Sequence, residues 1–274
     1  MFKAVLLALD NTPATGTAMR HAKEFARDHE AHVTGIAVLD AKRLGNVGMV
    51  PVGAGMHAKK LREHRLSVAN EKIEEAISNF ELAYRDSGIR YKILRVAGNP
   101  LEQIASHARC HDLTLIGSGF LFHHGVTDEP RDPLHRLMRR GLRPVLSIAA
   151  DCHTVKNVLI ALNESVESFM AMKRFAQLEL WPNATTEIVW CSKKTEPDTL
   201  MTAAREYCQL HRPNSDVHRH PGIPKQRLLE CAAEWKADLI VMEGCARRRF
   251  SLSGFLGDAT ASVTQHDHIS FFVN

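Results

Sequence analysis

The chain repeats a short sequence pattern after 153 positions, and this repeat constrains its fold more than any other feature. VLLALDNTP at residues 5–13 returns as VLIALNES at residues 158–165. Each copy is an apolar run that stops on a polar residue, which is typical of a buried strand. Asp10 stands at the stop in the first copy, and Asn163 stands there in the second. Two halves that begin alike are expected to fold alike.

Strands and helices alternate in the same order in both halves. A helical pattern follows the first strand, AMRHAKEFA in one half and AMKRFAQLE in the other. A strand rich in β-branched residues comes next, and later a Gly-x-Pro turn opens another helix before two more strands. The further strands are expected at residues 32–40, 91–98, 112–117 and 144–148, and at 186–193, 216–222, 238–244 and 269–273. This alternation predicts an α/β fold with a mostly parallel sheet and helices on both faces.

The break between the halves is expected near residues 150–154, where the closing strand of the first half has ended. Two domains follow from this, residues 1–151 and residues 152–274. Their sizes agree with the usual range of about 100–200 residues per domain.

Composition excludes several classes of protein. The 35 basic and 31 acidic side chains give a net charge of only +4, which does not indicate a nucleic-acid-binding surface, whereas small anions stay plausible ligands. No stretch approaches the roughly 18 apolar residues that span a bilayer, and the start of the chain does not resemble a secretion signal. The six cysteines form no CxxC pair, which favours reduced thiols. A cytoplasmic protein without membrane contact is therefore expected.

The order of these motifs resembles the universal stress protein superfamily, through VLLALD, the Gly-x-Pro helix entry, DLTLIG and the closing strand PVLSI. The resemblance covers the whole chain as a tandem pair. It implies two Rossmann-like domains of the adenine nucleotide alpha hydrolase type, each with a five-stranded, mostly parallel sheet. It also implies an internal pseudo-dimer, in which the closing strands at 144–148 and 269–273 pair across a two-fold axis. Whether two chains pair further as a homodimer stays open.

The resemblance further implies a pocket for ATP. Nucleotide-binding members carry a glycine motif, G-x2-G-x9-G-[ST], whose glycines let backbone amides approach phosphate at a helix N-terminus. An acidic residue after the first strand is placed to bind the ribose or the adenine, and Asp10 matches it. Gly117 and Gly119 match the motif, and Val38, near the end of the second strand, is assigned to the same pocket. Phe120 stands where the second motif glycine is expected.

The later part of the motif is lost in the first half, because Arg131 and Asp132 stand at the place of its G-[ST] ending. Acidic side chains in this loop would repel phosphate. The phosphate-binding loop of the first half is therefore expected to be degenerate.

The second half departs from the motif in other places. Gly244 and Gly257 keep the 13-residue spacing of the first and last motif glycines, and Asp258 and Thr260 follow at the start of the next helix. Arg247 replaces the middle glycine and could bind phosphate through its guanidinium. Asn163 replaces the carboxylate of the first half.

The register of the second motif stays open by one residue. Asp238 reaches Gly244 in six steps, whereas Asp112 reaches Gly117 in five. The glycine that matches Gly117 could therefore lie one position away from Gly244.

Each candidate also has a purely structural interpretation. Asp10 could cap nearby backbone amides in an Asx turn, and Asp258 could act as a helix N-cap. Three metal ligands could share one helix face at His107, Cys110 and His111, or these residues could be polar surface. His218 and His220 could face the nucleotide pocket or lie on a solvated strand edge. Cys191 and Cys231 could be reactive thiols or small core residues.

Two functions follow from the sequence. The first is a cytoplasmic stress-response protein that binds ATP or a related adenine nucleotide, with Mg²⁺ if it binds. No residue is dedicated to hydrolysis, so at most weak ATPase activity is expected. The second is an interaction scaffold for unknown protein partners, or a sensor of another small ligand, whose nucleotide pockets have decayed.

Overall fold

The computed structural model describes residues 2–48, 53–118, 137, 140, 142, 144–191, 198–213, 216–220, 228–244 and 269–274. Among these residues, no helix combines the length and the apolar character that a membrane span requires.

The first strands of each half alternate with helices, as the sequence predicts. The first half contains β1 (Ala4–Ala8), α1 (Pro13–His29), β2 (His32–Leu39), α2 (Ala41–Leu44), α3 (Gly55–Tyr84), β3 (Tyr91–Ala97), α4 (Pro100–Ala108), β4 (Leu113–Gly117) and β5 (Val145–Ile148). The second half contains β6 (Asn157–Leu162), α6 (Val166–Leu178), β7 (Thr185–Trp190), α7 (Asp198–His211), β8 (Val217–His220), α8 (Leu228–Glu234), β9 (Leu239–Met242) and β10 (Ser270–Val273).

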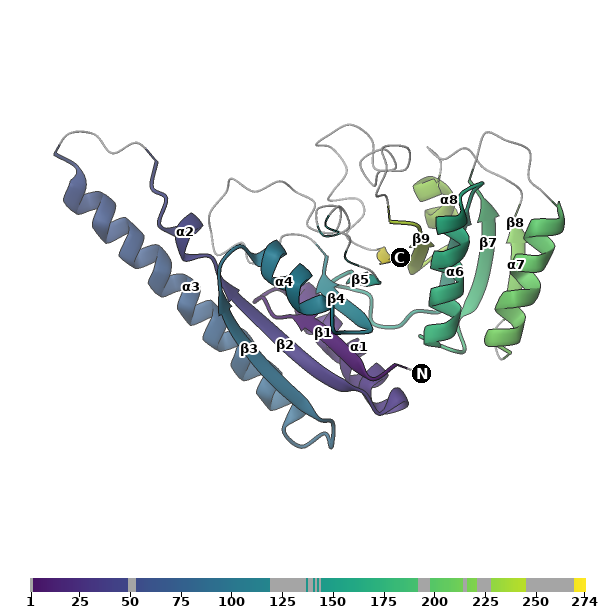
Figure 1. Ribbon diagram of the computed structural model, residues 1–274, viewed down its shortest axis with the longest axis horizontal. Coiled ribbons are helices and arrows are strands. Elements are labelled where there is room, and N and C mark those ends of the chain that lie inside the picture. Colours follow the sequence, from purple (N-terminus) through teal and green to yellow (C-terminus); the bar gives the residue numbers. More distant parts are fainter. Residues whose placement is uncertain are drawn as a thin grey trace.

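The strands form a single ten-stranded sheet in the order β3-β2-β1-β4-β5-β10-β9-β6-β7-β8. Neighbouring strands are parallel within each half, and the halves join through the antiparallel pair β5 and β10, in which Leu146 lies opposite Phe272. Figure 1 shows β3 and β8 at opposite ends of this sheet. The mostly parallel sheet and the pairing of the two closing strands are confirmed. The domain boundary between residues 151 and 152 stays a prediction.

Side chains alternate between two apolar layers, one on each face of the sheet. Leu7 and Phe272 belong to the layer under α1, α3, α6 and α7, whereas Leu6 and Phe271 belong to the layer under α4 and α8. Helices therefore cover both faces, as expected. Both layers run across the β5–β10 junction, so the two halves share one core.

The two halves also repeat individual hydrogen bonds. Asp112 Oδ2 accepts from the backbone N–H groups of Lys3 and Ala4, at 2.8 and 3.0 Å. Asp238 Oδ2 accepts in the same way from Lys156 and Asn157, at 2.8 and 2.9 Å. Each aspartate ties the start of its half's fourth strand to the start of the first strand. The sequence repeat is thus a structural repeat.

The first helix of each half begins and ends alike. Thr12 caps α1 and Ser165 caps α6, each through a side-chain oxygen that accepts from a backbone N–H three residues later. Both helices end at a glutamate in the left-handed conformation, Glu30 and Glu179, each with φ of 51°. This local agreement fixes the position of each helix N-terminus beside the carboxyl end of its strand.

Candidate functional site

The topology creates one point in each half where a ligand can sit at the edge of the sheet. β1 has β2 on one side and β4 on the other, and α1, which follows β1, and α4, which precedes β4, cover opposite faces. The carboxyl ends of such neighbouring strands border a crevice in doubly wound folds. The equivalent point in the second half lies between β6 and β9.

Asp10 lies at this point in the first half and is only 7% exposed. Its Oδ1 accepts a hydrogen bond from the Thr12 hydroxyl at 2.7 Å and another from the Thr15 hydroxyl. Thr12 is the N-cap of α1, so Asp10 holds the hydroxyl that caps the helix. Asp10 thus supports the helix cap through two hydroxyl groups. The capping of backbone amides in an Asx turn and the contact with a ribose stay predictions.

Gly117 lies on the neighbouring strand, at the end of β4, and the N-terminus of α1 approaches it closely. A Cβ atom at this position would meet the backbone nitrogen of Thr15 at 2.9 Å and the carbonyl carbon of Ala14 at 3.0 Å. Real Cβ atoms do not come so close to a backbone. The glycine is therefore required for packing, whatever else it binds.

In the second half, the carboxylate comes from a different strand. Asn163 replaces Asp10 after β6, but the buried Glu243 follows β9 and lies beside it. Asn163 Nδ2 donates to Glu243 Oε1 at 3.1 Å, and the hydroxyl of Ser165, the N-cap of α6, donates to Glu243 Oε2. Asn163 Oδ1 accepts from the backbone N–H of Ser165 at 2.6 Å. In each half, one carboxylate thus accepts a hydrogen bond from the hydroxyl group that caps the first helix.

The strand pairing settles the register that the sequence left open. Leu113 pairs with Val5 and Leu239 pairs with Val158, which makes Leu239 the counterpart of Leu113. Ser118 N–H donates to Ile148 O at 2.7 Å, and Gly244 N–H donates to Asn274 O at 2.9 Å. Gly244 therefore corresponds to Ser118, and Glu243 takes the place of Gly117.

Sequence reasoning missed Glu243, although a signal was present. The end of the fourth strand reads IGS in one half and MEG in the other, so aligning the two aspartates before these strands places glutamate opposite glycine. Its role could be recognised only once β6 and β9 were known to be neighbouring strands. A carboxylate there would repel a phosphate group.

The other predicted site residues fall into two groups. Val38 is fully buried in β2, in the apolar layer under α4. The remaining five lie outside the described residues: Gly119, Arg247, Gly257, Asp258 and Thr260.

The histidine candidates have structural partners. The ring of His111 contacts the His107 carbonyl oxygen through Nδ1 at 2.8 Å and the Thr34 hydroxyl through Nε2 at 3.0 Å. His220 stacks on Trp235 with ring centroids 3.8 Å apart, and its Nε2 lies 3.2 Å from Glu187 Oε2. Within the described ranges, no group of three or more His, Cys, Asp or Glu residues could hold a metal ion.

The described cysteines form no disulfide bond with one another. Four are buried, and Cys110 is exposed. Burial raises the pKa of Cys208 to about 11, so this thiol stays protonated at neutral pH. The interpretation of Cys191 and Cys231 as buried core residues is confirmed.

Comparison with known proteins agrees with this architecture. The model of the universal stress protein family matches residues 1–119. A universal stress protein from Archaeoglobus fulgidus DSM 4304 has the same fold, with a TM-score of 0.64 at 17% identity over 98% of this chain and 95% of that chain. A functionally unknown protein from Pseudomonas aeruginosa PAO1 gives a TM-score of 0.56 at 16% identity over 99% of this chain and 92% of that chain. No curated protein matches this chain by sequence. Residues 1–119 therefore match the universal stress protein family, and the second half of the chain repeats the same fold.

Proposed function

We propose that this protein acts in the cytoplasm in a stress response, and that it binds one adenine nucleotide, ATP with Mg²⁺, in the first half only. The observation that supports this assignment is the exchange at the ends of β4 and β9. Gly117 leaves the end of β4 without a side chain, whereas Glu243 adds a buried carboxylate at the equivalent position.

Electrostatics favours the first half over the second. A nucleotide brings several negative charges, and a carboxylate that already accepts hydrogen bonds from Asn163 and Ser165 offers it no donor. In the first half, Asp10 accepts from two hydroxyl groups at one of its oxygens. A ribose hydroxyl would donate to the same carboxylate without bringing a like charge beside it.

A second function is favoured by the same hydrogen bonds. The Asp10 carboxylate already has a structural task as a partner of the Thr12 cap, and the phosphate motif departs from the family pattern. These two facts support an interaction scaffold that holds no nucleotide. The protein would then act through its surface, on partners that the fold alone does not identify.

Native mass spectrometry with and without Mg-ATP separates the two functions. Nucleotide binding predicts a mass increment of one ATP per chain, and Asp10→Asn should weaken that binding about tenfold, the usual effect of losing one hydrogen bond to a charged group. Glu243→Gln is the matched control, because it removes the equivalent carboxylate from the second half. Bare protein at millimolar Mg-ATP would support the scaffold. Equal loss of binding in both variants would contradict assignment to the first half.

A further inference from the structure

A separate cavity of about 470 Å³ lies where the two halves meet, away from the carboxyl ends of β1 and β6. One wall is the C-terminal part of α1, and the other is formed by residues 153–157 before β6 and residues 181–185 before β7. Its volume falls within the range of small-molecule sites, about 300–1,000 Å³. The cavity is independent of the proposed nucleotide site, because that site lies at the opposite end of α1.

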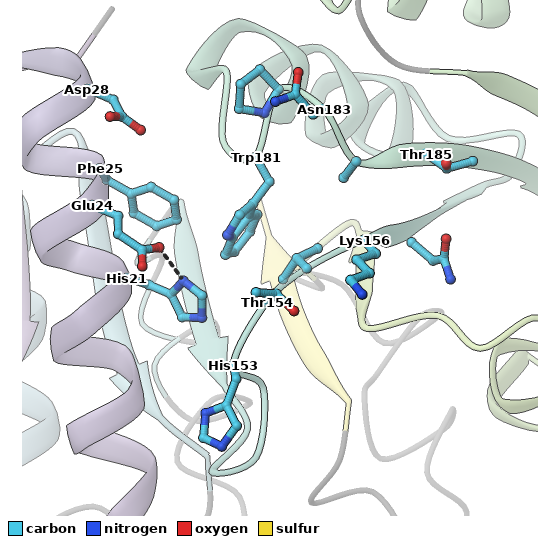
Figure 2. Close-up of a pocket in the computed structure, with 14 residues that line it drawn as sticks. His21, Glu24, Phe25, Asp28, His153, Thr154, Lys156, Trp181, Asn183 and Thr185 are labelled. Atoms are coloured by element: carbon cyan, nitrogen blue, oxygen red, sulfur yellow. Dashed lines mark ion pairs between the residues drawn. The ribbon is translucent and has the colours of Figure 1, made fainter.

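Three aromatic rings from both halves form the apolar part of the cavity. Trp181 packs edge-on against Phe25, with ring centroids 4.9 Å apart, and against His21, with centroids 5.2 Å apart. Figure 2 shows the Trp181 ring facing the side chains of α1. Trp181 has φ of 45°, which a bulky side chain rarely adopts. Such strained residues cluster at binding sites.

The hydrogen bonds of His21 leave two acceptors facing each other. Its Nε2 lies 2.8 Å from the carbonyl oxygen of Cys152, which can only accept, so Nε2 carries the proton. Burial lowers the pKa of His21, against the effects of the Cys152 hydrogen bond and the Glu24 charge. In the neutral ring, Nδ1 therefore has a lone pair, yet it lies 3.3 Å from Glu24 Oε2. A donor beside these two atoms, within hydrogen-bond reach of both, would relieve the repulsion.

Trp181, in contrast, needs a hydrogen-bond acceptor. Its indole Nε1 is a buried donor that has no hydrogen-bond partner among the described residues. Figure 2 shows this ring across the cavity from His21 and Glu24. A ligand that fits here therefore needs both a donor and an acceptor.

The charged side chains around the cavity favour a positively charged donor. Glu24 and Asp28 lie one turn apart on α1 and both line the cavity. Lys156 lines the other wall (Figure 2), and His153 is held by Arg20 at 2.9 Å. The α1 wall is thus negative and aromatic, which is the setting in which proteins bind organic ammonium groups.

We propose that this cavity binds a small organic cation, an amine with an apolar body and an oxygen atom close to its nitrogen. The ammonium group donates to His21 Nδ1 and to the Glu24 carboxylate. The apolar body packs on Phe25 and Trp181. The oxygen atom accepts from Trp181 Nε1 and faces the positive charge of Lys156.

Three related compounds test this assignment by isothermal titration calorimetry on the full chain. The probe is 2-amino-1-phenylethanol, which has the amine, the ring and the oxygen atom. Phenethylamine lacks the oxygen, and 1-phenyl-1,2-ethanediol replaces the amine with a neutral hydroxyl. We expect the probe to bind best, phenethylamine to bind more weakly, and the diol to show no binding. Equal binding of the probe and the diol, or no binding of the probe, would overturn the proposal.

Two variants locate the site. Glu24→Gln keeps the size of a side chain that is 47% exposed, so the fold should tolerate it, and it should weaken the probe about tenfold. Glu30→Gln, at the C-cap of the same helix, is the matched control, since Glu30 does not line the cavity and its replacement should leave binding unchanged. Trp181→Phe should make the affinities of the two amines equal. An unchanged affinity in Glu24→Gln would refute the site. Asp10→Asn should leave amine binding intact, which separates this proposal from nucleotide binding.

Discussion

Gly117 and Glu243 occupy equivalent positions, and Asp10 and Asn163 occupy the neighbouring pair of equivalent positions. Each half therefore has one carboxylate and one neutral residue where the first and fourth strands end. Carboxylates at both positions would repel each other at short distance. Without a carboxylate at either position, the capping hydroxyl would lack its charged acceptor. The two exchanges compensate for each other, so the helix cap is maintained while the charge moves to another strand.

Replacement of Gly117 tests the close approach of α1. Gly117→Ala should lower the free energy of unfolding by about 1–3 kcal/mol, because the added Cβ would press on the backbone of Ala14 and Thr15. Urea denaturation measures this. Gly16→Ala is the matched control on α1, where an added Cβ meets no atom within 4 Å. That change should stabilise the helix by about 0.5–1 kcal/mol. A Gly117→Ala protein as stable as the wild type would show that the contact relaxes freely.

Part of this site could be predicted from the sequence, and the rest could not. Asp10 and Gly117 were visible because each ends an apolar run. The partner of Asn163 was not, because a side chain eighty positions later becomes its neighbour only through strand pairing. Matching Gly244 to Gly117 also concealed the exchange, because that match places the register one residue too late.

Among the elements, α1 has two ends with different tasks. Its N-terminus packs on Gly117 and is capped beside Asp10. Its C-terminal half carries two buried histidines, of which His21 faces the second half. His21 contacts Cys152, and His29 stacks on Phe2 with ring centroids 4.3 Å apart. At 17 residues and about 1.5 Å per residue, the helix keeps the two regions roughly 25 Å apart.

Buried histidines on α1 should make stability depend on pH. Burial lowers the pKa of both His21 and His29, so below about pH 6.5 the unfolded chain binds more protons than the folded one. The free energy of unfolding should therefore fall as the pH is lowered from 7 to 5. His29→Gln should reduce this dependence in urea titrations. His57→Gln, at an exposed position on α3, is the control, and an equal pH dependence in all three proteins would contradict the prediction.

The helical sequence pattern predicted α1 and α6, because this signal is local. No local sequence pattern indicates the contact between α1 and Trp181. It joins residues from different halves, and it arises only because the antiparallel β5–β10 pair places these halves side by side. Cavities between repeated units are therefore the part of such a molecule that a sequence reveals least.

At the scale of the whole molecule, the junction of the sheet is symmetric. Leu146 pairs with Phe272, and these two residues hold the same position in β5 and β10 relative to Leu115 and Val241 of the neighbouring strands. A local two-fold axis therefore passes through this pair. A β5 strand could pair with a second copy of β5 in the register that it uses with β10.

This symmetry predicts that residues 1–151 expressed alone form a homodimer. Without β10, the edge of β5 has unpaired backbone groups and an exposed apolar face, and self-pairing is the arrangement that satisfies both. Light scattering after size-exclusion chromatography should give twice the fragment mass. An excess of a peptide with the sequence of residues 269–274 should compete for the edge and reduce the dimer, and a scrambled peptide is the control. A fragment that stays monomeric at high concentration would show that the first half does not need a strand partner.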